Sequence, residues 1–317
     1  MLKKIETVLI GTSLTEASDE VVRSGLKVAR AAKARVVLVH AYSPRAAYGG
    51  APFVPEVALD EVFETERKGL RRDMDSQAER LGVRIEELAA TILGPGPAHQ
   101  MLIETADKFK AGLIVVGASE VPRMAKLFGS TADRVVRRAV CPVLVVRQGL
   151  TIPPARVLLP VDLSILSAEA FHEGLDVLAL LAGERGDGIN LEALYVVTEL
   201  DRRLFAPEEA PERAEQHAKE ELRTFVDRHA AGSPFKIVPR ITAGYVEEEI
   251  LARLHEWEPD LVVLGTHGRS GFERFLLGSV ATRVIRDGGT NLLIVPPSAA
   301  RQQAEAVREA NQEVLVG

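Results

Sequence analysis

Three glycines, Gly265, Gly268 and Gly278, follow a short apolar run, and Ser279 comes directly after the last of them. Because glycine has no Cβ, the backbone at such positions can approach a ligand closely. Apolar residues recur at helical intervals after Ser279, so the sequence predicts a helix N-terminus there, where unpaired N–H groups attract anions. The spacing therefore predicts a phosphate-binding turn, in which Ser279 either caps the helix or bonds a phosphate oxygen. A glycine-rich connection without a ligand is the alternative.

Two better-known phosphate-binding loops are excluded by the same residues. A Walker A loop requires Lys-Ser or Lys-Thr after its last glycine, whereas Ser279 follows Gly278 with no lysine between them. The GxGxxG fingerprint of dinucleotide-binding domains is also absent. Chemistry that depends on a lysine clamp is therefore not predicted.

The elements that must carry this turn occur twice, in a repeat of about 149 residues. The segment Val8–Ser13 corresponds to Val157–Asp162, so Ser13 is the counterpart of Asp162. Each half alternates strands and amphipathic helices, with five apolar strands per half, which is typical of a parallel sheet covered on both faces. The predicted fold class is α/β, with two tandem doubly wound domains of five parallel strands each. Ligands of such sheets bind beyond the carboxyl ends of the strands, where Asp162 and Gly265 are expected.

The repeat also suggests domain limits. We expect a first domain over residues 1–148, a second over residues 156–297, and a C-terminal tail over residues 298–317. The third strand of each half is predicted over residues 84–92 and 236–241, and the segments 42–60 and 199–212 are predicted to be connections. The charged segments that follow them, 61–81 and 211–230, are predicted to be helices.

Length and composition exclude several classes of protein. A chain of 317 residues is long enough for two domains of about 150 residues. Its net charge of −6 gives no basic surface for nucleic acid. Cys141 is the only cysteine, so no internal disulfide is expected, and we expect it to be an inert core thiol. The sequence shows neither a secretory signal nor an apolar run of about 18 residues, so a cytoplasmic location and no membrane span are expected.

The glycine turn resembles the nucleotide-binding signature of the universal stress protein family, G-x2-G-x9-G-[S/T], and the resemblance extends over both halves of the chain. It implies a Rossmann-like fold of the adenine nucleotide alpha hydrolase type and binding of ATP, alone or with Mg²⁺. By this resemblance Asp162, preceded by Pro160 and Val161, contacts the ribose, and the backbone of Val196 contacts adenine. The loop maps onto Leu264, Gly265, Gly268, Gly278 and Ser279, and Arg269, Val280 and Ala281 lie beside the phosphates.

The first half departs from this signature. Glu120 stands where the second glycine belongs, and eight residues instead of nine separate it from Gly129. A carboxylate repels phosphate, and Ser13 is a weaker hydrogen-bond partner for a ribose than Asp162. We therefore expect nucleotide in the second half only.

No residue is assigned a catalytic role. His267 is a candidate general base, but a hydrogen bond that orders the loop is the favoured interpretation. Arg269 is either a phosphate ligand or a solvated charge, and Asp162 is either a ribose ligand or a helix N-terminal residue. The histidines show no metal-ligand spacing, so no metal site is predicted.

The sequence favours an ATP-binding stress-response or signalling module that acts on an unidentified partner protein. The alternatives are a slow ATPase and a pairing or scaffold protein without a ligand. The two halves are expected to pair through their final strands, Val143–Val146 and Leu292–Val295, with a homodimer as a further arrangement.

Overall fold

The structure, a computed structural model, describes residues 4–43, 56–85, 88–118, 131–183, 188–205, 211–268 and 277–300, together with 302 and 306. The chain divides into two compact units, an N-terminal unit of Lys4–Val135 and a C-terminal unit that begins at Val136. Within the ranges just given, no helix is both long and apolar enough to cross a membrane.

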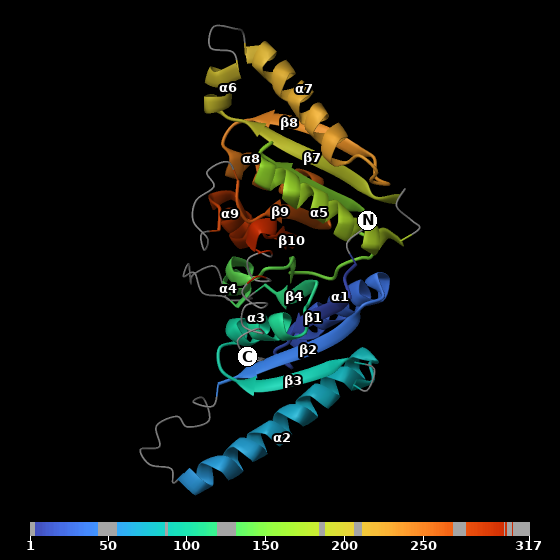
Figure 1. The fold of residues 1–317 in the computed structure, drawn as a ribbon, viewed down its shortest axis with the longest axis vertical. Helices are drawn as coiled ribbons and strands as arrows, with labels where there is room; N and C mark the ends of the chain where they lie inside the picture. The colour runs from blue at the N-terminus through green and yellow to red at the C-terminus, as the bar shows by residue number, and fades with distance from the viewer. Residues whose placement is uncertain are drawn as a thin grey trace. The chain divides into compact units, whose positions relative to one another are not determined.

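The N-terminal unit alternates strands and helices from its first strand onward (Figure 1). Its strands lie in the order β3-β2-β1-β4, and the printed pairings are parallel. Its elements are β1 (Thr7–Gly11), a short 3-10 helix (Glu16–Ser18), α1 (Asp19–Ala32), β2 (Arg35–Tyr42), α2 (Glu56–Leu81), β3 (Ala90–Pro95), α3 (Ala98–Lys108) and β4 (Leu113–Gly117). The boundary between the units falls inside α4 (Thr131–Arg138).

The C-terminal unit holds the second repeat and one strand of the first. Its strands lie in the order β5-β10-β9-β6-β7-β8. Neighbours are parallel except that β5 runs antiparallel to β10, which is the pairing expected of the two final strands. Its elements are β5 (Val143–Val146), β6 (Arg156–Val161), α5 (Ile165–Ala182), β7 (Asn190–Val197), α6 (Glu199–Phe205), α7 (Pro211–His229), β8 (Ile237–Ala243), α8 (Val246–Trp257), β9 (Leu261–Gly265), α9 (Ser279–Asp287) and β10 (Asn291–Val295).

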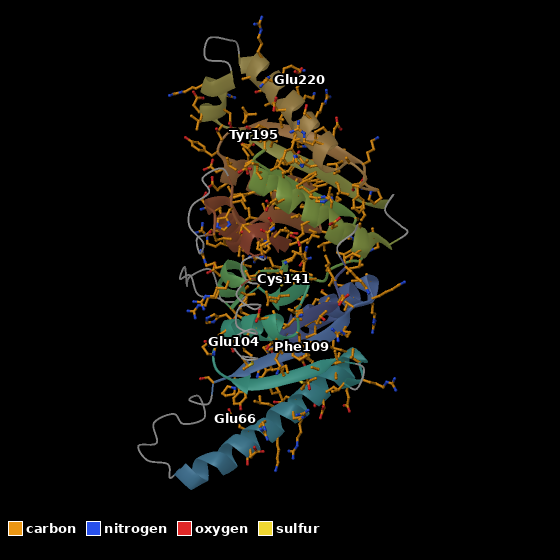
Figure 2. All side chains as sticks on the ribbon, viewed as in Figure 1. Glu66, Glu104, Phe109, Cys141, Tyr195 and Glu220 are labelled. Carbon is orange, nitrogen blue, oxygen red and sulfur yellow. The ribbon has the colours of Figure 1, made fainter. Side chains whose placement is uncertain are left out.

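Burial follows the pattern that parallel strands covered by helices require. Every residue of β5 and β10 is buried, as are the first four residues of β9. Tyr195, in β7, is among the largest fully buried side chains, and Cys141 is also buried, whereas Glu220 projects from α7 into solvent (Figure 2). The predicted α/β class and the tandem arrangement of two such folds are therefore confirmed.

The two repeats share an unusual turn after their first strands. Leu14 and Leu163 both have a φ of 63°, in the left-handed region that non-glycine residues rarely adopt. Leu14 comes three residues after Gly11, the last residue of β1, and Leu163 comes two residues after Val161, the last residue of β6. The turn supports the 149-residue register, including the correspondence of Ser13 with Asp162.

Three predicted element limits were wrong. The strand expected over residues 84–92 is β3, which begins only at Ala90. Gly82, at φ 63°, ends α2, and a further turn follows it. The chain first bonds to β2 at Ala89, whose N–H donates to the carbonyl of Val36. The segment 199–212 contains α6, whose first turn is stabilised by Asp201 accepting from the backbone and hydroxyl of Thr198. Helix α2 begins at Glu56, within the segment expected to be a connection.

Candidate functional site

A crevice opens in the C-terminal unit where β6 and β9 separate. The two strands pair only at Val157↔Leu261 and Leu158↔Val262. Farther along β6, Pro160 has no N–H to donate to a neighbouring strand. The chain continues from β6 to β7 on one side, whereas β9 lies on the other, so this is the topological switch point of the sheet. A small hollow there is lined by Leu159, Pro160, Val161, Ser167, Ala170, Phe171, Val263 and Gly265.

Asp162 lies at this crevice, directly after β6, and local hydrogen bonds orient it. Its Oδ1 accepts from the N–H of Ser164 at 3.0 Å, and its own N–H donates to Oγ of Ser167 at 3.2 Å. Ser164 is also the N-cap of α5, because its hydroxyl accepts from the N–H of Ser167 at 3.1 Å. The carboxylate is therefore held by the same turn that starts the helix.

Gly268 approaches this carboxylate closely from the β9 side. A Cβ built on Gly268 would lie 2.4 Å from Oδ2 of Asp162, a distance that real Cβ atoms do not tolerate. Only glycine fits here without a shift of Asp162 or of the loop. The structure thus brings together two residues that are 106 positions apart in the sequence and were singled out for different reasons.

The far end of the glycine loop returns to the same place. Gly278 is the N-cap of α9 and has no side chain with which to cap this helix. The N–H of Gly278 donates to the carbonyl of Thr266 at 2.9 Å, so the two ends of the loop are in direct contact. The predicted helix start at Gly278-Ser279 is confirmed. Ser279 is exposed, Val280 is half-buried and Ala281 is buried in the first turn.

Two apolar positions of the predicted set lie in the sheet itself. Val196 and Leu264 are each 4% exposed. The pairing of β6 with β7 ends at Val161↔Tyr195, so Val196 lies one residue beyond it. Leu264 directly precedes Gly265 at the end of β9. Arg269, the remaining residue of the set, lies outside the described residues.

Sequence reasoning missed three polar residues of this site, namely Ser164, Ser167 and Thr266. The two serines orient Asp162, and their spacing of three residues is a helix-capping pattern that could have been noticed. Thr266 forms a 2.8 Å hydrogen bond between its Oγ1 and Nδ1 of His267, which is a loop-ordering bond of the kind expected for that histidine. Among the described residues, no group of His, Cys, Asp or Glu could hold a metal ion.

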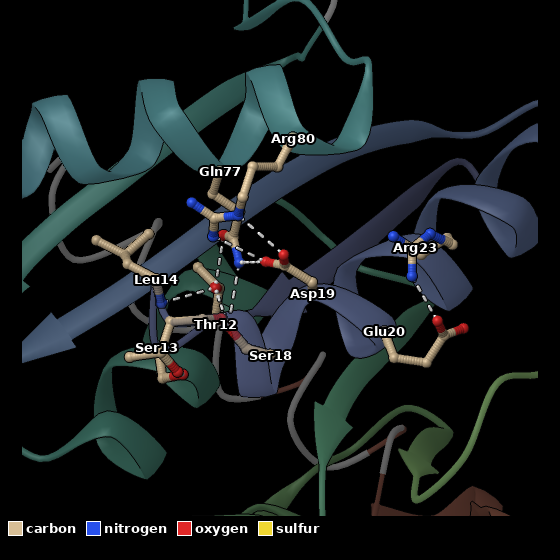
Figure 3. Close-up of polar contacts among 10 residues, drawn as sticks. Thr12, Ser13, Leu14, Ser18, Asp19, Glu20, Arg23, Gln77 and Arg80 are labelled. Carbon is tan, nitrogen blue, oxygen red and sulfur yellow. Dashed lines mark hydrogen bonds and ion pairs between the residues drawn. The ribbon is translucent and has the colours of Figure 1, made fainter.

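In the N-terminal unit, the corresponding turn contains a closed polar network (Figure 3). Ser13 is exposed and its hydroxyl bonds that of Thr15 at 2.8 Å. Gln77 of α2 is 1% exposed and contacts Thr12, Ser18 and Asp19. The hydrogen bond from Arg80 holds the pKa of the Asp19 carboxyl below its usual value. Glu120 and Gly129, which the sequence singled out here, lie outside the described residues.

Comparison with known proteins places this geometry in context. The model of the universal stress protein family matches residues 4–147 and 154–296. A universal stress protein of Mycolicibacterium smegmatis is 28% identical over 310 residues, which is 92% of this chain and 97% of that protein. One of Mycobacterium tuberculosis is 27% identical over 307 residues, with 92% and 96% covered.

Solved structures resemble the whole chain in fold. A universal stress protein from Archaeoglobus fulgidus superposes with a TM-score of 0.60 at 15% identity and covers 92% of this chain and 98% of its own. A functionally unknown protein from Pseudomonas aeruginosa gives a TM-score of 0.64 at 16% identity, with 96% and 98% covered. At these identities the likeness concerns the fold alone.

Proposed function

Because the chain belongs to the universal stress protein family, we propose that its second half binds ATP in the crevice between β6 and β9. The nucleotide acts as a signal that shifts the population of a conformation or of a partner complex. Rapid turnover is not proposed, because the described residues offer a phosphate cradle without an assigned general base or a lysine clamp.

The meeting of Asp162 with Gly268 is the observation that carries this proposal. A carboxylate accepts strong hydrogen bonds from the hydroxyls of a ribose. The bare backbone beside it lets the first phosphate of a nucleotide come close to the loop. A Cβ at position 268 would clash with Oδ2 of Asp162, so any other residue there would displace this carboxylate or the loop.

The phosphate end of the nucleotide is assigned to the start of α9. The N-cap Gly278 has no capping side chain, so we assign the N–H groups of the first turn, at Ser279, Val280 and Ala281, as donors for phosphate oxygens. Among the described residues, a Cβ at Gly278 would meet only the carbonyl of Thr266, at 3.4 Å, so this glycine does not obstruct the approach to these groups.

The adenine end is assigned to the backbone of Val196 and the apolar wall formed by Pro160, Val161 and Leu264. Adenine presents an amino donor where guanine presents a carbonyl acceptor. A backbone group in a fixed position can pair with one base, whereas the other base places donor against donor or acceptor against acceptor. The site is therefore expected to prefer ATP to GTP.

The proposal is tested on the full-length protein. Mass spectrometry of nucleotide released from freshly purified protein should detect an adenine nucleotide, and calorimetry should give a higher affinity for ATP than for GTP. Asp162→Ala should remove most of the binding heat, whereas Asp227→Ala, an exposed aspartate of α7, should leave it unchanged. Equal affinity of wild type and Asp162→Ala would overturn the assignment, and a protein that binds no nucleotide would favour the ligand-free pairing function.

A further inference from the structure

Thr266 connects three segments at the mouth of the crevice. Its N–H donates to the carbonyl of Val295 at the end of β10, at 3.1 Å, and its carbonyl accepts from Gly278 at the start of α9. The residue is 4% exposed. Backbone hydrogen bonds on both sides therefore fix the main chain of Thr266.

The hydroxyl of Thr266 fixes the imidazole of His267. Oγ1 of Thr266 and Nδ1 of His267 are 2.8 Å apart. When the hydroxyl donates this hydrogen bond, the neutral ring carries its hydrogen on Nε2 and offers it as a donor. His267 is half-buried, and no residue of the described ranges bonds its Nε2.

The position of His267 in the chain indicates which ligand group its Nε2 can contact. His267 directly precedes Gly268, the residue that faces the carboxylate of Asp162. Directly before Thr266 comes Gly265, the carboxyl end of β9. The ring therefore belongs to the segment where β9 enters the proposed phosphate loop.

We infer that His267 donates a hydrogen bond from Nε2 to a phosphate oxygen of the bound nucleotide, with Thr266 as the positioning residue that sets the ring through Nδ1. The inference rests on the proposed function and adds a side-chain ligand to the backbone cradle. Phosphate oxygens only accept hydrogen bonds, so phosphate selects the ring form in which Nε2 carries the hydrogen and Nδ1 accepts from the Thr266 hydroxyl. The pair does not occur in the first half, where Ala118 and Ser119 follow Gly117.

Calorimetry with ATP and with adenosine on full-length variants tests this inference. His267→Ala should weaken ATP binding about tenfold and leave adenosine binding unchanged, because only ATP carries phosphates. His267→Gln should restore part of the loss, since its amide is also a donor. Thr266→Val should weaken ATP binding severalfold, and Thr266→Ser, which keeps the hydroxyl, should bind as wild type.

Control variants and a double mutant separate a phosphate contact from a structural role. Thr290→Val removes a buried hydroxyl that donates to Pro259, and His255→Ala removes a histidine of α8; neither should change the ratio of ATP to adenosine affinity. Thr266→Val added to His267→Ala should cause no further loss, because the hydroxyl acts through the ring. If His267→Ala lost the same factor of affinity for ATP and adenosine, or lost none, the inference would be overturned. The proposal that the protein binds ATP would still stand. Failure of wild type to bind ATP would overturn the proposed function as well.

Discussion

At the scale of single residues, the site depends on small side chains as much as on charged ones. Gly268 leaves room for Asp162, and Gly278 leaves room in front of the first turn of α9. Gly278 has a φ of −55°, which any residue adopts, so its backbone conformation does not require glycine.

Substitution of Gly278 should therefore affect ligand binding more than folding. Gly278→Val places a branched side chain where phosphate approaches and should weaken ATP binding at least tenfold, about 1.4 kcal/mol. Gly278→Ala should lower the stability by no more than about 1 kcal/mol, because alanine is a poorer N-cap than glycine but fits the same backbone conformation. Calorimetry and thermal melting measure the two effects, and an unchanged ATP affinity for Gly278→Val would remove this end of the loop from the site.

Glu173, on α5, gives the C-terminal unit a distinct dependence of stability on pH. Burial, with the like charges of Asp176 and Glu169, raises the pKa of its carboxyl from 4.5 to about 7. The folded state therefore binds a proton more tightly than the unfolded state, so this group's contribution to stability falls as pH rises from about 4.5 to about 7.

Glu173→Gln should abolish that dependence. At pH 8 the variant should be more stable than wild type by about 1–2 kcal/mol after allowance for solvent screening, and at pH 4 the two should be equal. Urea unfolding at both pH values measures the difference. Glu248→Gln, at an exposed position of α8, is the matched control. A wild type as stable as Glu173→Gln at pH 8 would contradict the assigned cause.

At the scale of elements, each half anchors the long helix that precedes its third strand differently. In the C-terminal unit, Phe225 of α7 packs edge-on against Phe171 of α5, with ring centroids 5.4 Å apart. In the N-terminal unit, hydrogen bonds anchor Gln77 of α2 to the turn between β1 and α1 (Figure 3). Its side chain accepts from the hydroxyl of Thr12 at 2.8 Å and donates to the hydroxyl of Ser18 at 3.1 Å. An apolar contact and a satisfied polar network thus have the same structural role.

Gln77→Ala should loosen α2 selectively. It removes the oxygen that accepts from the Thr12 hydroxyl and the amide that donates to Ser18, and the loss of hydrogen bonds at a buried site costs about 1–3 kcal/mol. Hydrogen exchange should become faster in α2 and stay unchanged in α7. Gln100→Ala, an exposed glutamine of α3 bonded to Glu104, is the control, and unaltered protection of α2 in Gln77→Ala would contradict the anchoring role.

These anchors also show what could be predicted from sequence. Apolar periodicity predicted the strands that end at Asp162 and Gly265, because burial on both faces leaves a local pattern. The partners of Gln77 are 58 to 65 residues away, and no local pattern encodes them. The role of Thr266 likewise depends on Val295 and Gly278, which only the folded sheet brings near. Helix α6 was missed because its start depends on the Thr198–Asp201 capping bonds more than on periodicity.

At the scale of the whole molecule, the repeat is symmetric in its strands and asymmetric in its chemistry. The final strands β5 and β10 pair, and Asn291 strengthens that pairing by accepting from the N–H groups of Arg147 and Gln148, at 2.9 and 3.2 Å. Asn291 is 1% exposed and its amide also donates to the carbonyl of Asp260. Its counterpart in the first half is Pro142, which has no side-chain amide, so only the second half supplies such a side chain at this pairing.

The same asymmetry sets the expected stoichiometry at one ATP per chain. Ser13 in place of Asp162, Glu120 in place of Gly268 and Ala118 in place of Thr266 all affect the first-half site. Losses of about 1–2 kcal/mol at each would together weaken binding there a hundredfold or more if they add. Equilibrium titration should then saturate near one ATP per chain, and Asp162→Ala should remove most of the signal. Two equivalent sites would refute the degenerate first half, while steady-state turnover of about 1 per second, low in the ordinary enzyme range, would favour the slow ATPase over the binding module.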